Sequence, residues 1–216
     1  MKQMGSYIKD LIAEGEHQRL DFKFEISDSK KIARTLAAFA NTNGGRLLVG
    51  VKDNGVIAGV RSEEEYYMVE AAASMYCKPE LSFSTKEWRI EGKLVLEIIV
   101  NKSPEKPHSA PDKDNNWKVF VRVKDQNLLS NRILLLLWKH QKSGKGVEIR
   151  YREQEELLLH YLHENAFITL SAFSRHAGIP RFLAEKILVN FILLDIINMD
   201  ITEKQTYYRL VDNRAC

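Results

Sequence analysis

The chain has 216 residues, of which 44% are apolar and 28% are charged, and its formal net charge is +3. This composition is typical of a globular protein and excludes a disordered or collagen-like chain. No apolar run approaches the ~20 residues that span a bilayer, and the N-terminus lacks the apolar core of a signal peptide. We therefore expect a cytoplasmic protein without a membrane partner. The two cysteines, Cys77 and Cys216, suggest neither a disulfide framework nor a zinc site.

The positive charge is concentrated in the N-terminal part of the chain. Residues 148–216 contain eight basic and ten acidic residues, a net charge of −2, which leaves +5 for residues 1–147. A net charge this small does not diagnose binding to a polyanion, so its distribution is more informative. We expect the N-terminal part to make the main electrostatic contact with any nucleic acid.

The first 40 residues predict a helix, a strand and a second helix. Residues 5–15 form an amphipathic pattern, and residues 30–40 repeat apolar side chains at helical spacing with N-cap candidates at 27–29. Residues 19–26 alternate polar and apolar side chains, which predicts a strand with one wet face. Asp21, Lys23 and Glu25 are expected to point together away from the core.

The next segment predicts a helix end followed by a hairpin. Residues 41–45 are rich in Asn and Gly, which tolerate the left-handed conformation at a helix end. Residues 46–51 read as a strand, and the Asn-Gly pair at 54–55 is typical of a two-residue hairpin turn. Residues 56–60 are therefore expected to return as the partner strand.

Further elements follow in the same way. The patterns predict a helix over 63–76, strands over 81–86 and 88–100, and a proline-bearing loop over 101–116. A strand over 117–124 is expected to expose Lys118 and Arg122, and residues 130–142 are expected to form a helix. Gly45 and Gly50 are followed by no Gly-Lys-Ser/Thr, so a P-loop and ATPase activity are excluded.

Several of these motifs occur in a fixed order. Glu16, the run LDFK at 20–23 and the run AFANTNGGRLLVGVKDNGVIAG at 38–59 resemble the Schlafen AlbA_2 family over about residues 10 to 130. The resemblance implies an α+β fold, with a mixed or antiparallel sheet and packed helices. The turn at 124–127 lacks the glycine or serine of the family, and Asp21 stands where a glutamate is more common.

The chain is predicted to have two domains. We assign residues 1–138 to the AlbA_2-like domain, residues 139–147 to a basic, glycine-bearing linker, and residues 148–216 to the second domain. The second domain shows three helical patterns, a turn at 177–180 and two strands around 202–205. This order resembles a winged helix-turn-helix.

Three acidic residues form the candidate catalytic site. Glu16, Asp21 and Asp53 match the positions of the three-acid site with which eukaryotic Schlafen relatives act as metal-dependent ribonucleases. If these carboxylates converge, they would bind Mg²⁺ or Mn²⁺, and no other cofactor is expected. The alternative is that Asp53 is an ordinary turn residue and that Glu16 and Asp21 are solvated.

Basic residues are the candidate contacts to nucleic acid. In the first domain they are Lys23, Arg46, Lys52, Lys118, Arg122 and Lys124, and in the second they are Arg181, Lys186 and Lys204. The resemblance favours a bacterial-type DNA-binding protein that regulates transcription, with homodimerisation as a further expectation. The alternatives are a metal-dependent nuclease and a protein-interaction adaptor.

Overall fold

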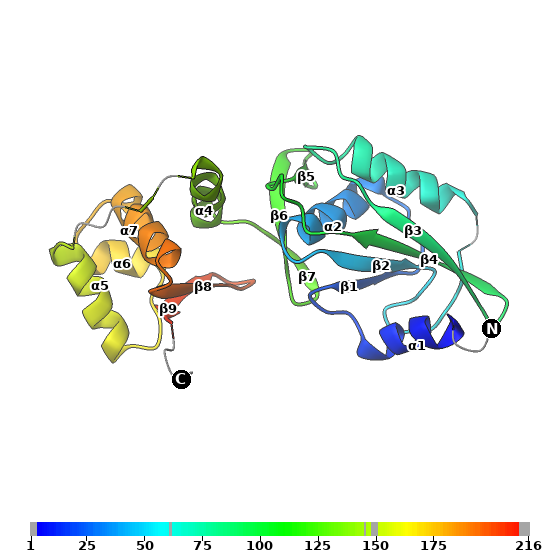
Figure 1. The fold of residues 1–216 in the computed structure, drawn as a ribbon, viewed down its shortest axis with the longest axis horizontal. Coiled ribbons are helices and arrows are strands. Elements are labelled where there is room, and N and C mark those ends of the chain that lie inside the picture. The colour runs from blue at the N-terminus through cyan, green and yellow to red at the C-terminus, as the bar shows by residue number, and fades with distance from the viewer. Residues whose placement is uncertain (1–3, 61, 145, 148–150, 212–216) are drawn as a thin grey trace. The chain divides into compact units, whose positions relative to one another are not determined.

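The computed structural model describes residues 4–60, 62–144, 146–147 and 151–211 (Figure 1). The chain divides into two compact units, Met1–Ser130 and Asn131–Cys216. The helix α4 (Arg132–Ser143) belongs to the second unit because Ile133 and Leu137 are buried in that unit's core. The division thus lies before α4 and not at residue 138, and residues 139–143 of the expected linker are helical. Cys216 lies outside the described residues.

The first unit is built on a four-stranded sheet. Its strands follow the order β1 (Leu20–Lys23), β2 (Gly45–Val49), β4 (Lys93–Val100) and β3 (Ser84–Ile90). β1 and β2 are parallel, whereas the other neighbours are antiparallel. The mixed sheet and its helices confirm the predicted α+β class.

Helices cover both faces of this sheet. On one face, Ile8 of α1 (Met4–Glu14) packs in a core cluster with Leu20, Phe22, Leu48 and Val95. On the other face, α2 (Ser29–Asn41) and α3 (Glu64–Ser74) enclose a second and larger cluster. β1 is therefore covered on both sides.

The helix α2 lies between the sheet and a smaller antiparallel sheet. The second sheet consists of β5 (Ser109–Pro111), β6 (Trp117–Val123) and β7 (Gln126–Leu129), and both β5 and β6 pack on α2. Four alanines of α2 are fully buried: Ala33, Ala37, Ala38 and Ala40. Their small side chains allow strands to approach the helix from two sides. A helix that is apolar around most of its circumference is typically buried inside a domain. Asp28 caps the helix by accepting a hydrogen bond from the backbone N of Lys30.

The Asn/Gly segment after α2 serves packing. The Nδ2 of Asn41 donates to the carbonyls of His108 and Phe120, each at 2.8 Å, and its Oδ1 accepts from the backbone N of His108 at 2.7 Å. Gly44 has φ +69°, and a Cβ at Gly45 would lie 2.5 Å from the Phe39 ring. These residues therefore attach the end of α2 to the second sheet and start β2.

The predicted hairpin is present only as a turn. Lys52 accepts from the backbone N of Gly55 and donates to the carbonyl of Val56, but residues 56–60 form no strand. Their strand-like pairing is a single bridge between Val51 and Ile57. β2 already pairs with β1 on one edge and with β4 on the other, so a returning segment can pair only beyond its end.

The second unit adds three helices and a hairpin to α4. They are α5 (Glu153–Glu164), α6 (Leu170–His176), α7 (Arg181–Leu193), β8 (Ile197–Ile201) and β9 (Thr206–Leu210). The core contains Leu158, Phe173, Leu188, Phe191 and Tyr208. The expected order of three helices and two strands is confirmed, whereas the assignment to the winged helix class stays a prediction. Within the described residues, no helix combines the length and the apolarity needed to cross a bilayer.

A polar pocket in the first unit as the candidate functional site

Residues from β1, α2, β6, β7 and the connecting turns line one open pocket of about 500 Å³. It contains acidic and basic side chains that are far apart in the sequence. The acids are Glu16, Asp21, Asp53, Asp112 and Asp125, and the bases are Lys23, Lys31, Arg34, Lys113 and Arg122. All three predicted catalytic residues therefore line the same cavity.

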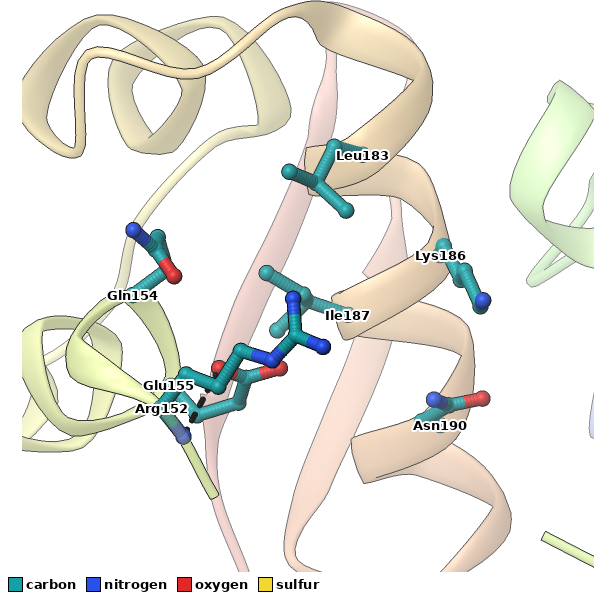
Figure 2. Close-up of a pocket in the computed structure, with 7 residues that line it drawn as sticks. All are labelled: Arg152, Gln154, Glu155, Leu183, Lys186, Ile187 and Asn190. Atoms are coloured by element: carbon teal, nitrogen blue, oxygen red, sulfur yellow. Dashed lines mark hydrogen bonds between the residues drawn. The ribbon is translucent and has the colours of Figure 1, made fainter. Parts of the chain in front are cut away.

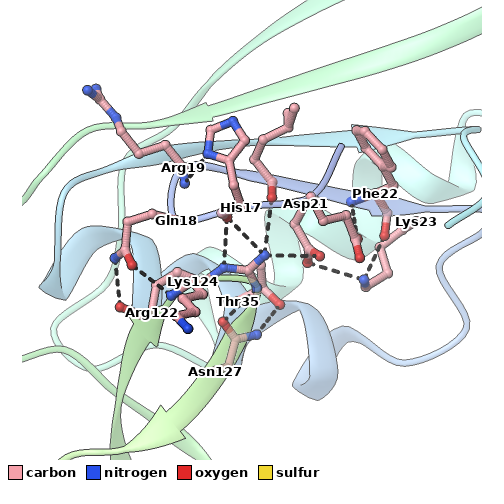
Figure 3. A network of polar contacts seen from close by, with 12 residues as sticks. His17, Gln18, Arg19, Asp21, Phe22, Lys23, Thr35, Arg122, Lys124 and Asn127 are labelled. Atoms are coloured by element: carbon pink, nitrogen blue, oxygen red, sulfur yellow. Dashed lines mark hydrogen bonds and ion pairs between the residues drawn. The ribbon is translucent and has the colours of Figure 1, made fainter. Parts of the chain in front are cut away.

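Arg122 is the centre of the hydrogen-bond network beneath the pocket (Figure 3). Its side chain is 1% exposed, and its Nη2 lies 3.1 Å from the carbonyl of Leu20 and 3.3 Å from that of His17. Its Nη1 donates to Oδ1 of Asn127 at 3.1 Å, and the guanidinium lies over the ring of Phe39. The expectation that Arg122 is exposed is wrong, because its face of β6 packs towards α2 and β1. As placed, it holds these elements together and cannot reach a phosphate.

Asp21 is the ionic partner of Arg122. Its Oδ1 lies 3.4 Å from Nη2 of Arg122 and its Oδ2 lies 3.2 Å from Nζ of Lys23. Asp21 is only 3% exposed, so the prediction that it points away from the core is wrong, whereas Lys23 is half-buried and Glu25 is exposed. Period-two alternation assumes one solvated face, whereas β1 is covered on both faces. Lys23 already has two partners within the site, because its Nζ pairs with Asp21 and also donates to the carbonyl of Phe22 at 2.6 Å.

Glu16 lies beside Asp21, and its pKa is raised. One of its oxygens accepts a hydrogen bond from the backbone N of Phe22 at 2.8 Å. Burial, together with the hydrogen bond to Asp21, raises the pKa of Glu16 to about 7 and outweighs the opposing effect of the Phe22 N–H. Glu16 is therefore close to half protonated at neutral pH.

The three acids do not form a metal site as they stand. Asp53 is exposed on the turn after β2, while both oxygens of Asp21 face cations. In the part of the chain that the structure describes, no three His, Cys, Asp or Glu side chains gather closely enough to hold a metal ion. The pocket thus brings the predicted residues together without completing a cation site.

Several residues of the pocket were not predicted from the sequence. Lys31, Arg34 and Thr35 follow one another on one side of α2 at helical spacing, which was the available signal. Nε of Arg34 donates to the carbonyl of Pro111, and Nδ2 of Asn127 donates to Oγ1 of Thr35, both at 2.9 Å. No local pattern indicates that these segments meet.

The other basic residues of the first unit that were predicted to contact nucleic acid differ in whether their side chains are free to bind a phosphate. Nε of Arg46 is bound at 3.0 Å by Glu97, a fully buried carboxylate, and Nζ of Lys52 lies over the ring of Phe24. Lys52 is nevertheless exposed, as are Lys118 and Lys124, whose side chains have no such partner among the described residues. Lys118 and Lys124 therefore remain candidate phosphate contacts outside the pocket.

In the second unit, Arg181 pairs with the buried Glu185 at 3.2 Å, whereas Lys186 and Lys204 are exposed. Lys186 lies on α7 beside a polar pocket of about 330 Å³, which Arg152 enters from the start of α5 (Figure 2). Arg152 immediately precedes α5, so the helical spacing of apolar residues in the sequence did not identify it as a candidate contact. Lys186 and Arg152 thus both flank a polar surface of this unit.

Residues 16–131 of the chain match the family model described as Schlafen, AlbA_2. No curated protein matches the chain. The DIP2311 protein from Corynebacterium diphtheriae is similar over 67% of this chain and 33% of its own, with 21% identity and a TM-score of 0.47. The N-terminal domain of a RecG-related protein from Nitrosomonas europaea is similar over 61% of this chain and 97% of its own, with 22% identity and a TM-score of 0.41. The chain therefore spans about a third of the first of these proteins.

Proposed function

The chain belongs to the Schlafen AlbA_2 family, and from this premise we propose that it binds nucleic acid, specifically DNA, and acts as a transcriptional regulator without cleaving its target. One observation carries the proposal. Two of the five acids that line the pocket carry a reduced negative charge: Asp21 is paired with Arg122 and Lys23, and burial raises the pKa of Glu16. Their repulsion of a phosphate is correspondingly reduced.

Cations at the mouth of the pocket would then contact the DNA backbone. Lys31 and Lys113 are exposed and line the pocket, and Arg34 is half-buried beside them. Lysine side chains in such positions bind phosphate oxygens as mobile point charges and displace condensed counterions. Contacts of this kind give affinity without base specificity, so the target sequence would be set elsewhere.

The test is the salt dependence of DNA binding by the purified full chain. We expect affinity for a labelled duplex to fall with salt concentration. The double variant Lys31→Ala/Lys113→Ala should reduce the slope of log K against log salt by about 0.9 for each phosphate that the protein no longer neutralises. Lys86→Ala is the matched control, because Lys86 is exposed on β3 at the opposite edge of the sheet. An unchanged slope in the double variant, or no binding by the wild type, would contradict the proposal.

A metal-dependent nuclease is the second candidate, because Glu16, Asp21 and Asp53 line one pocket. The same gels, run with Mn²⁺, with Mg²⁺ and with chelator, separate it from the first candidate. Our proposal expects intact duplex DNA and intact structured RNA in every lane. If cleavage occurs only with metal and Asp53→Ala abolishes it while binding persists, the nuclease replaces the regulator. A chain that neither binds nor cleaves would instead favour an adaptor.

A further inference from the structure

The second unit contains an open groove of about 620 Å³ between α4 and α7. Its apolar lining consists of Leu136 of α4, Phe182 and Val189 of α7, and Val147. Phe182 is 69% exposed, which is unusual for so large an apolar side chain. The groove therefore presents apolar surface that nothing in this unit covers among the described residues.

The charges around the groove are predominantly positive. Glu185, its one acidic lining residue among those described, is buried and is neutralised by Nε of Arg132 at 2.9 Å and Nε of Arg181 at 3.2 Å. The remaining ionisable lining groups are Lys139, His140 and Lys186. The groove is thus lined by apolar side chains and by lysines whose charge is not cancelled by Glu185.

We propose that the groove between α4 and α7 binds a small organic anion with an apolar body, such as an aromatic or aliphatic carboxylate. Its volume lies within the range of about 300 to 1,000 Å³ typical of small-molecule sites, and such sites combine apolar walls with a few polar groups. The apolar body would cover Phe182 and Val189, while the anionic group would face Lys139. A DNA phosphate lacks an apolar body and would leave the apolar side chains of the groove exposed to solvent. The inference is independent of the DNA-binding proposal.

The probe for this test is 8-anilinonaphthalene-1-sulfonate, an apolar anion whose fluorescence rises on binding. We expect saturable binding to the full chain with one class of site. Its uncharged counterpart, N-phenyl-1-naphthylamine, should bind more weakly because it cannot use the cations. Equal affinity for the two dyes would overturn the anionic requirement, and the absence of saturable sulfonate binding would overturn the site.

Variants at the groove locate the bound dye. Phe182→Ala and Lys139→Glu should each weaken sulfonate binding about fivefold, as expected for one apolar or one exposed ionic contact. Both side chains are exposed, so neither change should unfold the unit. Phe167→Ala, at an exposed aromatic elsewhere in this unit, and Tyr67→Ala, in an open groove of the first unit, are the controls. Loss of binding in either control with retention in the groove variants would overturn the assignment.

Discussion

At the scale of single residues, the candidate site contains a buried ion pair between Arg122 and Asp21. Removing one partner of a buried pair leaves an uncompensated charge, which typically costs about 3–5 kcal/mol. We therefore expect Arg122→Ala to lower the free energy of unfolding by about that amount, measured by urea denaturation. The carbonyls of His17 and Leu20 would each lose one donor in the same variant and keep the backbone hydrogen bond that each accepts from the other residue.

Lys118 provides the control for this substitution on the same strand. Lys118 is exposed, so Lys118→Ala should change the free energy of unfolding by less than about 0.5 kcal/mol. If Arg122→Ala were as mild as Lys118→Ala, the guanidinium would not be structural, and Arg122 would again be a candidate phosphate contact.

The protonation of Glu16 predicts a pH dependence of stability. Its pKa is about 7 in the folded chain, against an ordinary value of 4.5, so the folded state binds more protons between these values. The stabilisation is therefore fully present below pH 4.5 and is lost as the pH rises through 7. Thermal unfolding of the wild type should show a fall in stability over this window that Glu16→Gln lacks.

The comparison with Glu16→Gln isolates this one group, because all other ionisable residues are common to both chains. A glutamine stays neutral and has nearly the same shape as protonated glutamate. If the two stability profiles were parallel from pH 4.5 to about 8, Glu16 would titrate normally, and burial and Asp21 would not raise its pKa.

At the scale of elements, the end of α2 depends on the close approach of backbone at Gly44. A Cβ there would lie 2.7 Å from the carbonyl oxygen of Val100 and 2.9 Å from the backbone N of Lys102, and φ is +69°. Gly144 has a similar φ of +61° with no neighbour within 4 Å. Gly44→Ala should therefore cost about 1–3 kcal/mol more than Gly144→Ala, because only the first adds overpacking to backbone strain. Equal losses in chemical denaturation would show that φ alone determines the cost.

The local elements were predictable because their signals are local. The capping of α2, the Gly-rich helix end and the turn at Lys52 to Gly55 follow from neighbouring residues. The burial of Asp21 did not follow, because it depends on Arg122, about a hundred residues later. The absence of a strand at residues 56–60 also has a distant cause. β4 occupies the edge of β2 with which this segment was expected to pair.

The candidate site shows the same division between local and distant information. The resemblance placed Glu16, Asp21 and Asp53 in one set, and they do line one pocket. Apart from Lys23, the cations that neutralise or flank them come from α2, β6 and the turn before β6, and no pattern in the sequence relates these segments. The sequence therefore indicates the acids of the site, but the balance of charge that distinguishes binding from metal chemistry requires the fold.

At the scale of the whole molecule, the boundary between the units decides which fragments fold. Ile133 and Leu137 are buried in the second unit's core, and Arg132 pairs with the buried Glu185. Burying one large aliphatic side chain contributes about 1.5–3 kcal/mol, so losing two removes a large part of the roughly 5–15 kcal/mol that stabilises a typical domain.

A fragment of residues 131–216 should therefore unfold cooperatively on heating, as followed by circular dichroism, whereas a fragment of residues 139–216 should show a weaker transition or none. Residues 1–130 should likewise unfold cooperatively, because their two core clusters lie within that unit. Equal stability of the two C-terminal fragments would mean that α4 contributes little to the second unit's core. In that case α4 could detach from the rest of the second unit, and the groove would lose the side chains that α4 contributes. The proposed ligand would then have to hold α4 against α7.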